Sequence, residues 1–116
     1  MRPSRMSLRN REVESLARDR LREQGYEVIR SAGLHAPIDL VAWKHDGSLL
    51  FIRTARTRRV TRGTVADVTV KFRTDVDSLR RLPRLPYLAV QLWVYGDSRG
   101  WGFFDVFPGG IMEVEG

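Results

Sequence analysis

The chain has 116 residues and a formal net charge of +6, and 42% of its residues are hydrophobic. This length allows one domain with one modest core. The absence of cysteine excludes disulfides and thiolate metal sites, and no run approaches the roughly 18 apolar residues of a membrane span. Because the basic start lacks the apolar region of a signal peptide, we expect an intracellular, cytoplasmic protein that does not contact membranes.

All but two of the 20 basic residues are arginine; the exceptions are Lys44 and Lys71. Arginine has a planar guanidinium that binds phosphate in a bidentate way, so the excess is consistent with nucleic-acid binding. Codon bias in a GC-rich genome would produce the same excess. Composition leaves both interpretations open, and the positions of the arginines have to decide.

The N-terminal half predicts a helix and three strands. Gly25 ends the helical pattern in the position where a left-handed residue is favoured, and Asp46-Gly47 is a strong hairpin signal between two apolar runs. We therefore expect a flexible basic tail, a helix, a short strand and two hairpin strands at residues 1–6, 7–24, 26–30, 38–45 and 48–55.

The C-terminal half predicts a second helix over residues 64–82 and two strands over 87–95 and 101–107. Residues 109–116 are expected as a flexible tail that adds at most a short edge strand. The order α-β-β-β-α-β-β gives the fold class α/β, with a mixed sheet of about five strands flanked by helices. Residues 1–116 are expected to form a single domain.

Four separated segments together resemble one known family. They are "EQGYEVIRSAG", "HAPIDLVAW", "LPYLAVQLWVY" and "WGFFDV". In order and spacing they are similar to the archaeal Holliday-junction resolvase branch of the PD-(D/E)XK nuclease superfamily, over residues from about 12 to 107. The resemblance implies a restriction-endonuclease-like fold, a homodimer, branched DNA as partner, and a role in DNA recombination and repair. By the same analogy, residues 68–76 and 101–107 are candidate dimer-interface segments.

The resemblance also implies a metal site. In such nucleases Mg²⁺ or Mn²⁺ is bound by a strand aspartate, by an acid on the next strand and often by a glutamate of the first helix, while a lysine follows two residues after the second acid. Mg²⁺ prefers several oxygen ligands in an octahedral arrangement. Carried over by position, the helix glutamate is Glu14 and the strand aspartate is Asp39. The second acid falls on Arg53, the lysine on Ala55, and a polar loop residue on Leu34.

These replacements leave three hypotheses open. In the first, Arg53 replaces the metal by a salt bridge to Asp39, and by extension to Glu14, because unit charges about 4 Å apart at an effective dielectric near 20 interact by roughly 4 kcal/mol. The protein would then bind DNA without cutting it and need no cofactor. In the second, a rebuilt Mg²⁺ or Mn²⁺ site uses Glu14 and Asp39, with Lys71 as the catalytic lysine; otherwise Lys71 is a solvated helix charge. In the third, the chain is a non-catalytic dimerisation subunit of an active paralogue.

Arginines are concentrated in one region. No acid occurs between Asp46 and Asp67, and such a stretch is typical either of a surface that follows phosphates or of a basic loop without a ligand. The predicted nucleic-acid contacts, on branched or double-stranded DNA, are Arg30, Ser31, Arg53, Arg56, Arg58, Arg59 and Arg62.

The remaining candidate side chains have simpler interpretations. His35 and His45 have no second ligand at metal-binding spacing, so no zinc site is expected. The aromatic residues in the strands are expected to fill the core or a dimer interface rather than to stack on bases: Trp43, Trp93, Trp101, Phe103 and Phe104.

Overall fold

The computed structural model describes residues 5–31, 36–57, 65–97 and 100–115, with side chains from residue 11 onward. Three helices and six strands follow in chain order: α1 (Arg5–Glu23), β1 (Glu27–Arg30), β2 (Leu40–Trp43), β3 (Leu49–Thr57), α2 (Val65–Lys71), α3 (Arg73–Arg80), β4 (Leu88–Gly96), β5 (Gly100–Phe107) and β6 (Gly110–Val114). None of these helices is long and apolar enough to cross a bilayer.

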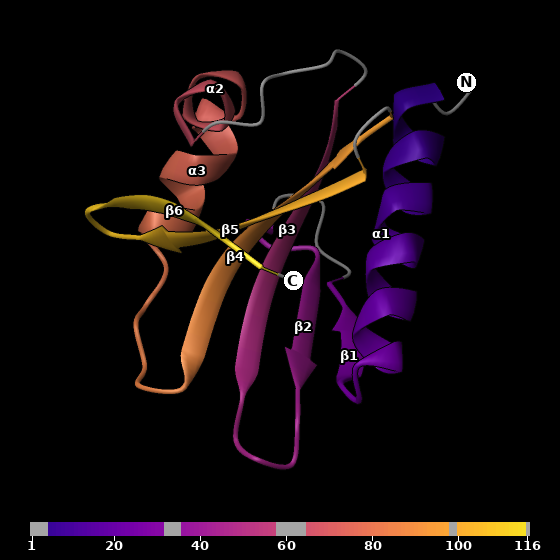
Figure 1. Ribbon diagram of the computed structural model, residues 1–116, viewed down its shortest axis with the longest axis vertical. Helices are drawn as coiled ribbons and strands as arrows, with labels where there is room; N and C mark the ends of the chain where they lie inside the picture. Colours follow the sequence, from indigo (N-terminus) through magenta and orange to yellow (C-terminus); the bar gives the residue numbers. More distant parts are fainter. Residues whose placement is uncertain (1–4, 32–35, 58–64, 98–99, 116) are drawn as a thin grey trace.

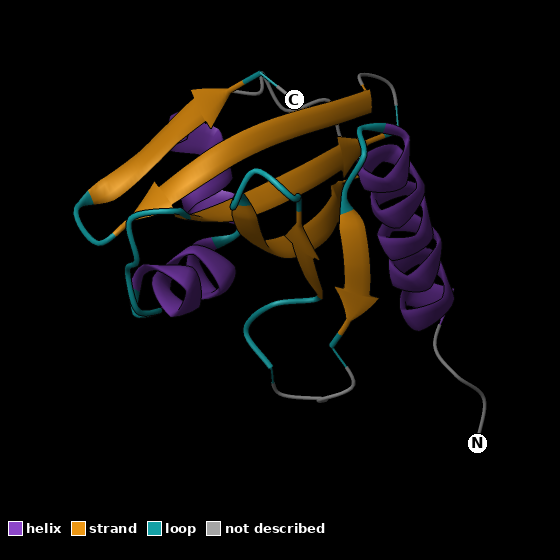
Figure 2. Cartoon of the chain, turned by 90° about the horizontal axis from the view of Figure 1, so that it is seen from below, coloured by secondary structure: helices purple, strands orange, loops and turns teal. Residues whose placement is uncertain are grey.

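All six strands form one mixed sheet in the order β1-β2-β3-β4-β5-β6. Neighbouring strands are antiparallel except β3 and β4, which are parallel. A parallel pair needs a crossover connection, and α2 and α3 supply it. Helix α1 covers one face of the sheet and α2 and α3 cover the other (Figure 1). The same layers are visible from below in Figure 2. The predicted mixed α/β fold is therefore confirmed.

Two details differ from the prediction. The sheet has six strands instead of about five, because residues 110–114 form β6 on the edge of β5, the short edge strand that residues 109–116 were expected to add at most. The second helix, expected over residues 64–82, is divided at Phe72, whose φ of −112° and ψ of 34° are not helical. The division is a kink, since backbone bonds of 2.9 Å join Phe72 to both Val68 and Val76. It lets α2 and α3 each turn a buried valine towards the sheet.

The core has two parts, one on each face of the sheet. Under α1, the buried residues are Ala17, Leu21, Leu40, Ala42, Ile52, Trp93 and Phe103. Under α2 and α3, they are Val68, Val76, Leu79, Val90, Leu92, Val94, Phe104 and Val106. Three of the predicted core aromatics are thus confirmed, whereas Trp43 remains 39% exposed.

Strand β3 runs between the two core layers and sends alternate side chains to each. Ile52 packs in the α1 layer, while Phe51 and Ala55 pack against the other. Successive side chains of a strand point to opposite faces, so Arg53 is directed to the α2/α3 side and Arg56 to the α1 side. This alternation decides which acids each arginine meets.

Candidate functional site

The site forms where β2 begins beside β3. The backbone N–H of Asp39 donates to the carbonyl of Ile52 at 2.8 Å, and the Asp39 carbonyl accepts from the N–H of Ser31 at 2.8 Å. These two bonds fix Asp39 between the end of β1 and the middle of β3. The Asp39 side chain, only 16% exposed, is therefore presented at one defined place at the start of β2.

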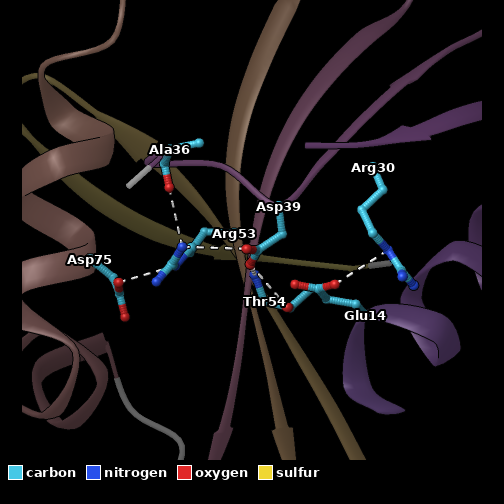
Figure 3. Close-up of polar contacts among 7 residues, drawn as sticks. All are labelled: Glu14, Arg30, Ala36, Asp39, Arg53, Thr54 and Asp75. Atoms are coloured by element: carbon cyan, nitrogen blue, oxygen red, sulfur yellow. Dashed lines mark hydrogen bonds and ion pairs between the residues drawn. The ribbon is translucent and has the colours of Figure 1, made fainter. Parts of the chain in front are cut away.

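Both carboxylate oxygens of Asp39 have partners (Figure 3). Oδ2 accepts from the backbone N–H of Thr54 at 2.8 Å and from its hydroxyl at 3.1 Å. Oδ1 accepts from Nη1 of Arg53 at 3.3 Å. A charge this far from water requires such compensation, and the predicted salt bridge between Arg53 and Asp39 is present.

The Arg53 guanidinium has a second acidic partner that the sequence did not indicate. Its Nε donates to Oδ1 of Asp75 at 3.1 Å, and Nη1 also lies 3.4 Å from the carbonyl of Ala36. The guanidinium of Arg53, on β3, thus connects Asp75 of α3 to the segment before β2 (Figure 3). Asp75 was missed because it lies 22 residues further along the chain, on a helix rather than on the next strand.

Glu14 reaches the same place from α1. Its Oε2 lies 3.4 Å from Nε of Arg30, which is its ion-pair partner in the structure, and its side chain is 18% exposed. Burial raises the pKa of Glu14, and the negative charge of Asp39 and a hydrogen bond to Asp39 raise it further, while Arg30 and Arg53 act in the opposite direction. The two acids predicted from the resemblance therefore do lie side by side.

This arrangement does not fit a divalent cation. Mg²⁺ would need the Asp39 oxygens that now accept hydrogen bonds from Arg53 and Thr54, and a fixed guanidinium at 3.3 Å would repel it. Within the described ranges no group of three or more histidines or acids has metal-binding geometry. Position 55 holds alanine rather than lysine, and the Ala55 side chain packs against the apolar α2/α3 layer.

Lys71 is bound at another place. Its ammonium donates a hydrogen bond to the hydroxyl of Thr57, the last residue of β3. Thr57 lies four residues beyond Arg53, which corresponds to roughly 13 Å along a strand. The structure thus anchors Lys71 at the end of β3 rather than beside the Glu14–Asp39 pair.

The described arginines of the predicted binding surface all have acidic neighbours. Arg30 pairs with Glu14, Arg53 with Asp39 and Asp75, and Arg56 with Asp97 and Glu12. The local sequence around them has few acids, but α1, α3 and the end of β4 bring acids to them in space. Arg58, Arg59 and Arg62 lie outside the described residues, as do Leu34 and His35.

Comparisons with known proteins bear on the fold. Searches against protein-family models and against curated proteins found no match. Among solved structures, the chain is similar to Hjc, a Holliday junction resolvase from the archaeal hyperthermophile Archaeoglobus fulgidus, with a TM-score of 0.61 and 22% sequence identity. The match covers 84% of this chain and 73% of the Hjc chain. At this identity the similarity concerns the fold, so this chain has the fold of an archaeal Holliday junction resolvase.

Proposed function

We propose that this protein binds branched or double-stranded DNA on a resolvase fold and does not cut it, because Arg53 takes the place of the divalent cation. The observation that supports this proposal is the position of the guanidinium, 3.3 Å from Asp39 and 3.1 Å from Asp75. In the family that the sequence resembles, position 53 provides the second metal-binding acid. Here the same position provides a permanent positive charge.

The charge balance of this cluster bears on where DNA can bind. Three acids, Glu14, Asp39 and Asp75, surround two bases, Arg30 and Arg53, so the ionised cluster would carry one net negative charge without any metal. A cluster of this sign does not attract a phosphate. We therefore place the DNA contacts outside it, on Arg56, whose partner Glu12 is exposed and 3.8 Å away, and on the basic residues that follow Arg56 in the sequence.

Binding of this kind is directed at the phosphate backbone. The net charge of +6 and the excess of arginine favour contacts without sequence preference. Affinity should then fall steeply as salt is raised, because each phosphate contact releases counterions. The fold similarity also supports a homodimer, which light scattering would show as twice the chain mass of 13.4 kDa.

The test compares binding with cleavage on the same substrates. A fluorescein-labelled four-way DNA junction and a linear duplex of matched sequence are titrated with the protein in EDTA at low and moderate salt, and are then incubated with Mg²⁺ or Mn²⁺. We expect salt-sensitive binding to at least one substrate and no cleavage of either. An absence of binding at low salt would reject the proposal.

A second candidate function is a metal-dependent endonuclease with a rebuilt site. The observation that favours it is the contact between the Glu14 and Asp39 carboxyls, since two adjacent acids are the start of a Mg²⁺ site. Cleavage that requires Mg²⁺ or Mn²⁺ and disappears in Asp39→Ala would establish this function. If Lys71→Ala also removed cleavage, Lys71 would be the lysine of the rebuilt site.

A further inference from the structure

The three described arginines of the predicted DNA-binding surface differ in how firmly their acidic partners hold them. Arg53 has two carboxylates and a carbonyl within 3.4 Å. Arg30 pairs with Glu14, whose side chain is 18% exposed. Arg56 differs from both, because one of its two partners, Glu12, is 71% exposed and lies 3.8 Å from Nη1.

The contact between Arg56 and Glu12 is the kind that an anion can replace. A distance of 3.8 Å is beyond hydrogen-bonding range. An exposed pair of this type changes an equilibrium constant by no more than about fivefold, because water screens it and both side chains lose freedom. The Arg56 side chain itself is only 23% exposed, so its guanidinium is held in place while Glu12 is free to leave.

The other partner of Arg56 holds the guanidinium in a fixed orientation. Nε of Arg56 donates to Oδ1 of Asp97 at 3.0 Å. Asp97 is in turn tied to the end of β3, since its backbone N–H donates to the Thr57 carbonyl at 3.3 Å. With Nε bound in this way, the Nη edge is directed to the side where Glu12 lies. Asp97 is therefore a positioning residue for Arg56.

We infer that Glu12 is a built-in competitor for phosphate at Arg56. In the free protein its carboxylate neutralises the Nη edge, and on binding a DNA phosphate displaces it into solvent. A DNA phosphodiester carries the same single negative charge as the carboxylate, but it can accept two hydrogen bonds from the Nη edge, whereas Glu12 at 3.8 Å makes none, so the exchange is favourable. Helix α1 thus lowers the affinity of the surface without blocking it. This inference rests on the proposed DNA-binding function.

The experiment measures the dissociation constant of a fluorescein-labelled linear DNA duplex at low salt by fluorescence anisotropy. Glu12→Gln removes the competing charge, and Glu23→Gln is the matched control. Glu23 is exposed on the same helix, and the 11 positions between the two correspond to about 16 Å. We expect Glu12→Gln to bind about two- to fivefold more tightly than wild type, and Glu23→Gln to bind with nearly wild-type affinity.

A double-mutant cycle separates the contact from general electrostatics. Arg56→Gln should weaken binding, and adding Glu12→Gln to it should give no further gain. Equal gains from Glu12→Gln and Glu23→Gln, or a gain that persists without Arg56, would overturn the inference while leaving DNA binding intact. Wild-type affinity in Arg56→Gln would also overturn it. If the wild-type protein does not bind the duplex or a four-way junction, both the inference and the proposed function fail. Thermal unfolding of each variant confirms that it is folded.

Discussion

Arg53 and Arg56 lie three residues apart on β3, but they face opposite layers of the molecule. Arg53 turns to α3 and the segment before β2, where Asp39 and Asp75 enclose it. Arg56 turns to α1, where its contact with Glu12 is long and exposed. Two arginines of one strand therefore have different environments. We propose that Arg53 replaces the metal ion as an internal cation, and that the Nη edge of Arg56 can bind a phosphate.

The largest expected effect comes from removing the internal cation. Arg53→Ala should lower the free energy of unfolding by roughly 3 kcal/mol, because it leaves Asp39 and Asp75 uncompensated in a mostly buried place. Urea denaturation measures this change. A loss no larger than that of Arg56→Ala would show that the two arginines do not differ as described.

A smaller loss of stability is expected when only one of the two acidic partners of Arg53 is neutralised. Asp75→Asn should cost about 1.5 kcal/mol in the same measurement, since Arg53 keeps its bonds to Asp39 and Ala36. Combining Asp75→Asn with Arg53→Ala should cost less than the sum of the two single changes. Additive costs would mean that the Arg53–Asp75 bond of 3.1 Å does not couple α3 to β3.

The acid beside this network gives a pH dependence with a defined sign. Because burial and Asp39 raise the pKa of Glu14 above its ordinary value of 4.5, at pH values between 4.5 and the raised pKa the folded protein retains a proton that the unfolded chain has lost. The folded state then binds more protons, and this contribution to stability is lost as the pH rises from 4.5 through the raised pKa.

Glu14→Gln removes this contribution. Relative to wild type, the variant should therefore become more stable as the pH is raised from 4.5 to neutral. Denaturation series at several pH values measure the difference. A constant difference between the two proteins over this range would contradict the close approach of Glu14 and Asp39.

The smallest effect on stability is expected at Arg56, because its acidic partners are more exposed than those of Arg53. Arg56→Ala should lower the free energy of unfolding by about 1 kcal/mol, since Asp97 and Glu12 are 39% and 71% exposed and water screens both pairs. The same variant should weaken DNA binding and reduce the salt dependence of the affinity by about one phosphate contact. A large loss of stability would place Arg56 with Arg53 as a structural residue.

Much of the fold could be predicted because its signals are local. The Asp46-Gly47 turn, the glycine at position 25 and the alternation of apolar residues specify the first helix and the hairpin. The structure gives both glycines a positive φ, +91° at Gly25 and +93° at Gly47. Strand β6 was expected as no more than a short edge strand of a flexible tail, because its pairing with β5 depends on a two-residue turn at Pro108 and Gly109 rather than on its own pattern.

The contacts of the site could be predicted only where the pairing of neighbouring strands determines which side chains meet. Asp39 and Arg53 face each other across neighbouring strands, so their ion pair followed from register. Asp75, Asp97 and Glu12 reach β3 from other elements, and their contacts depend on how those elements pack. The sequence between Asp46 and Asp67 contains no acid, yet in the folded protein its described arginines, Arg53 and Arg56, both lie beside carboxylates from other elements.

The most direct test of the account is a crystal of the wild-type protein soaked in Mn²⁺, with anomalous diffraction recorded at the manganese edge. We expect that Nη1 of Arg53 remains within hydrogen-bonding distance of Asp39, as it is at 3.3 Å here, and that no anomalous peak lies beside Asp39. A manganese ion bound by Glu14 and Asp39, with the guanidinium moved aside, would contradict it.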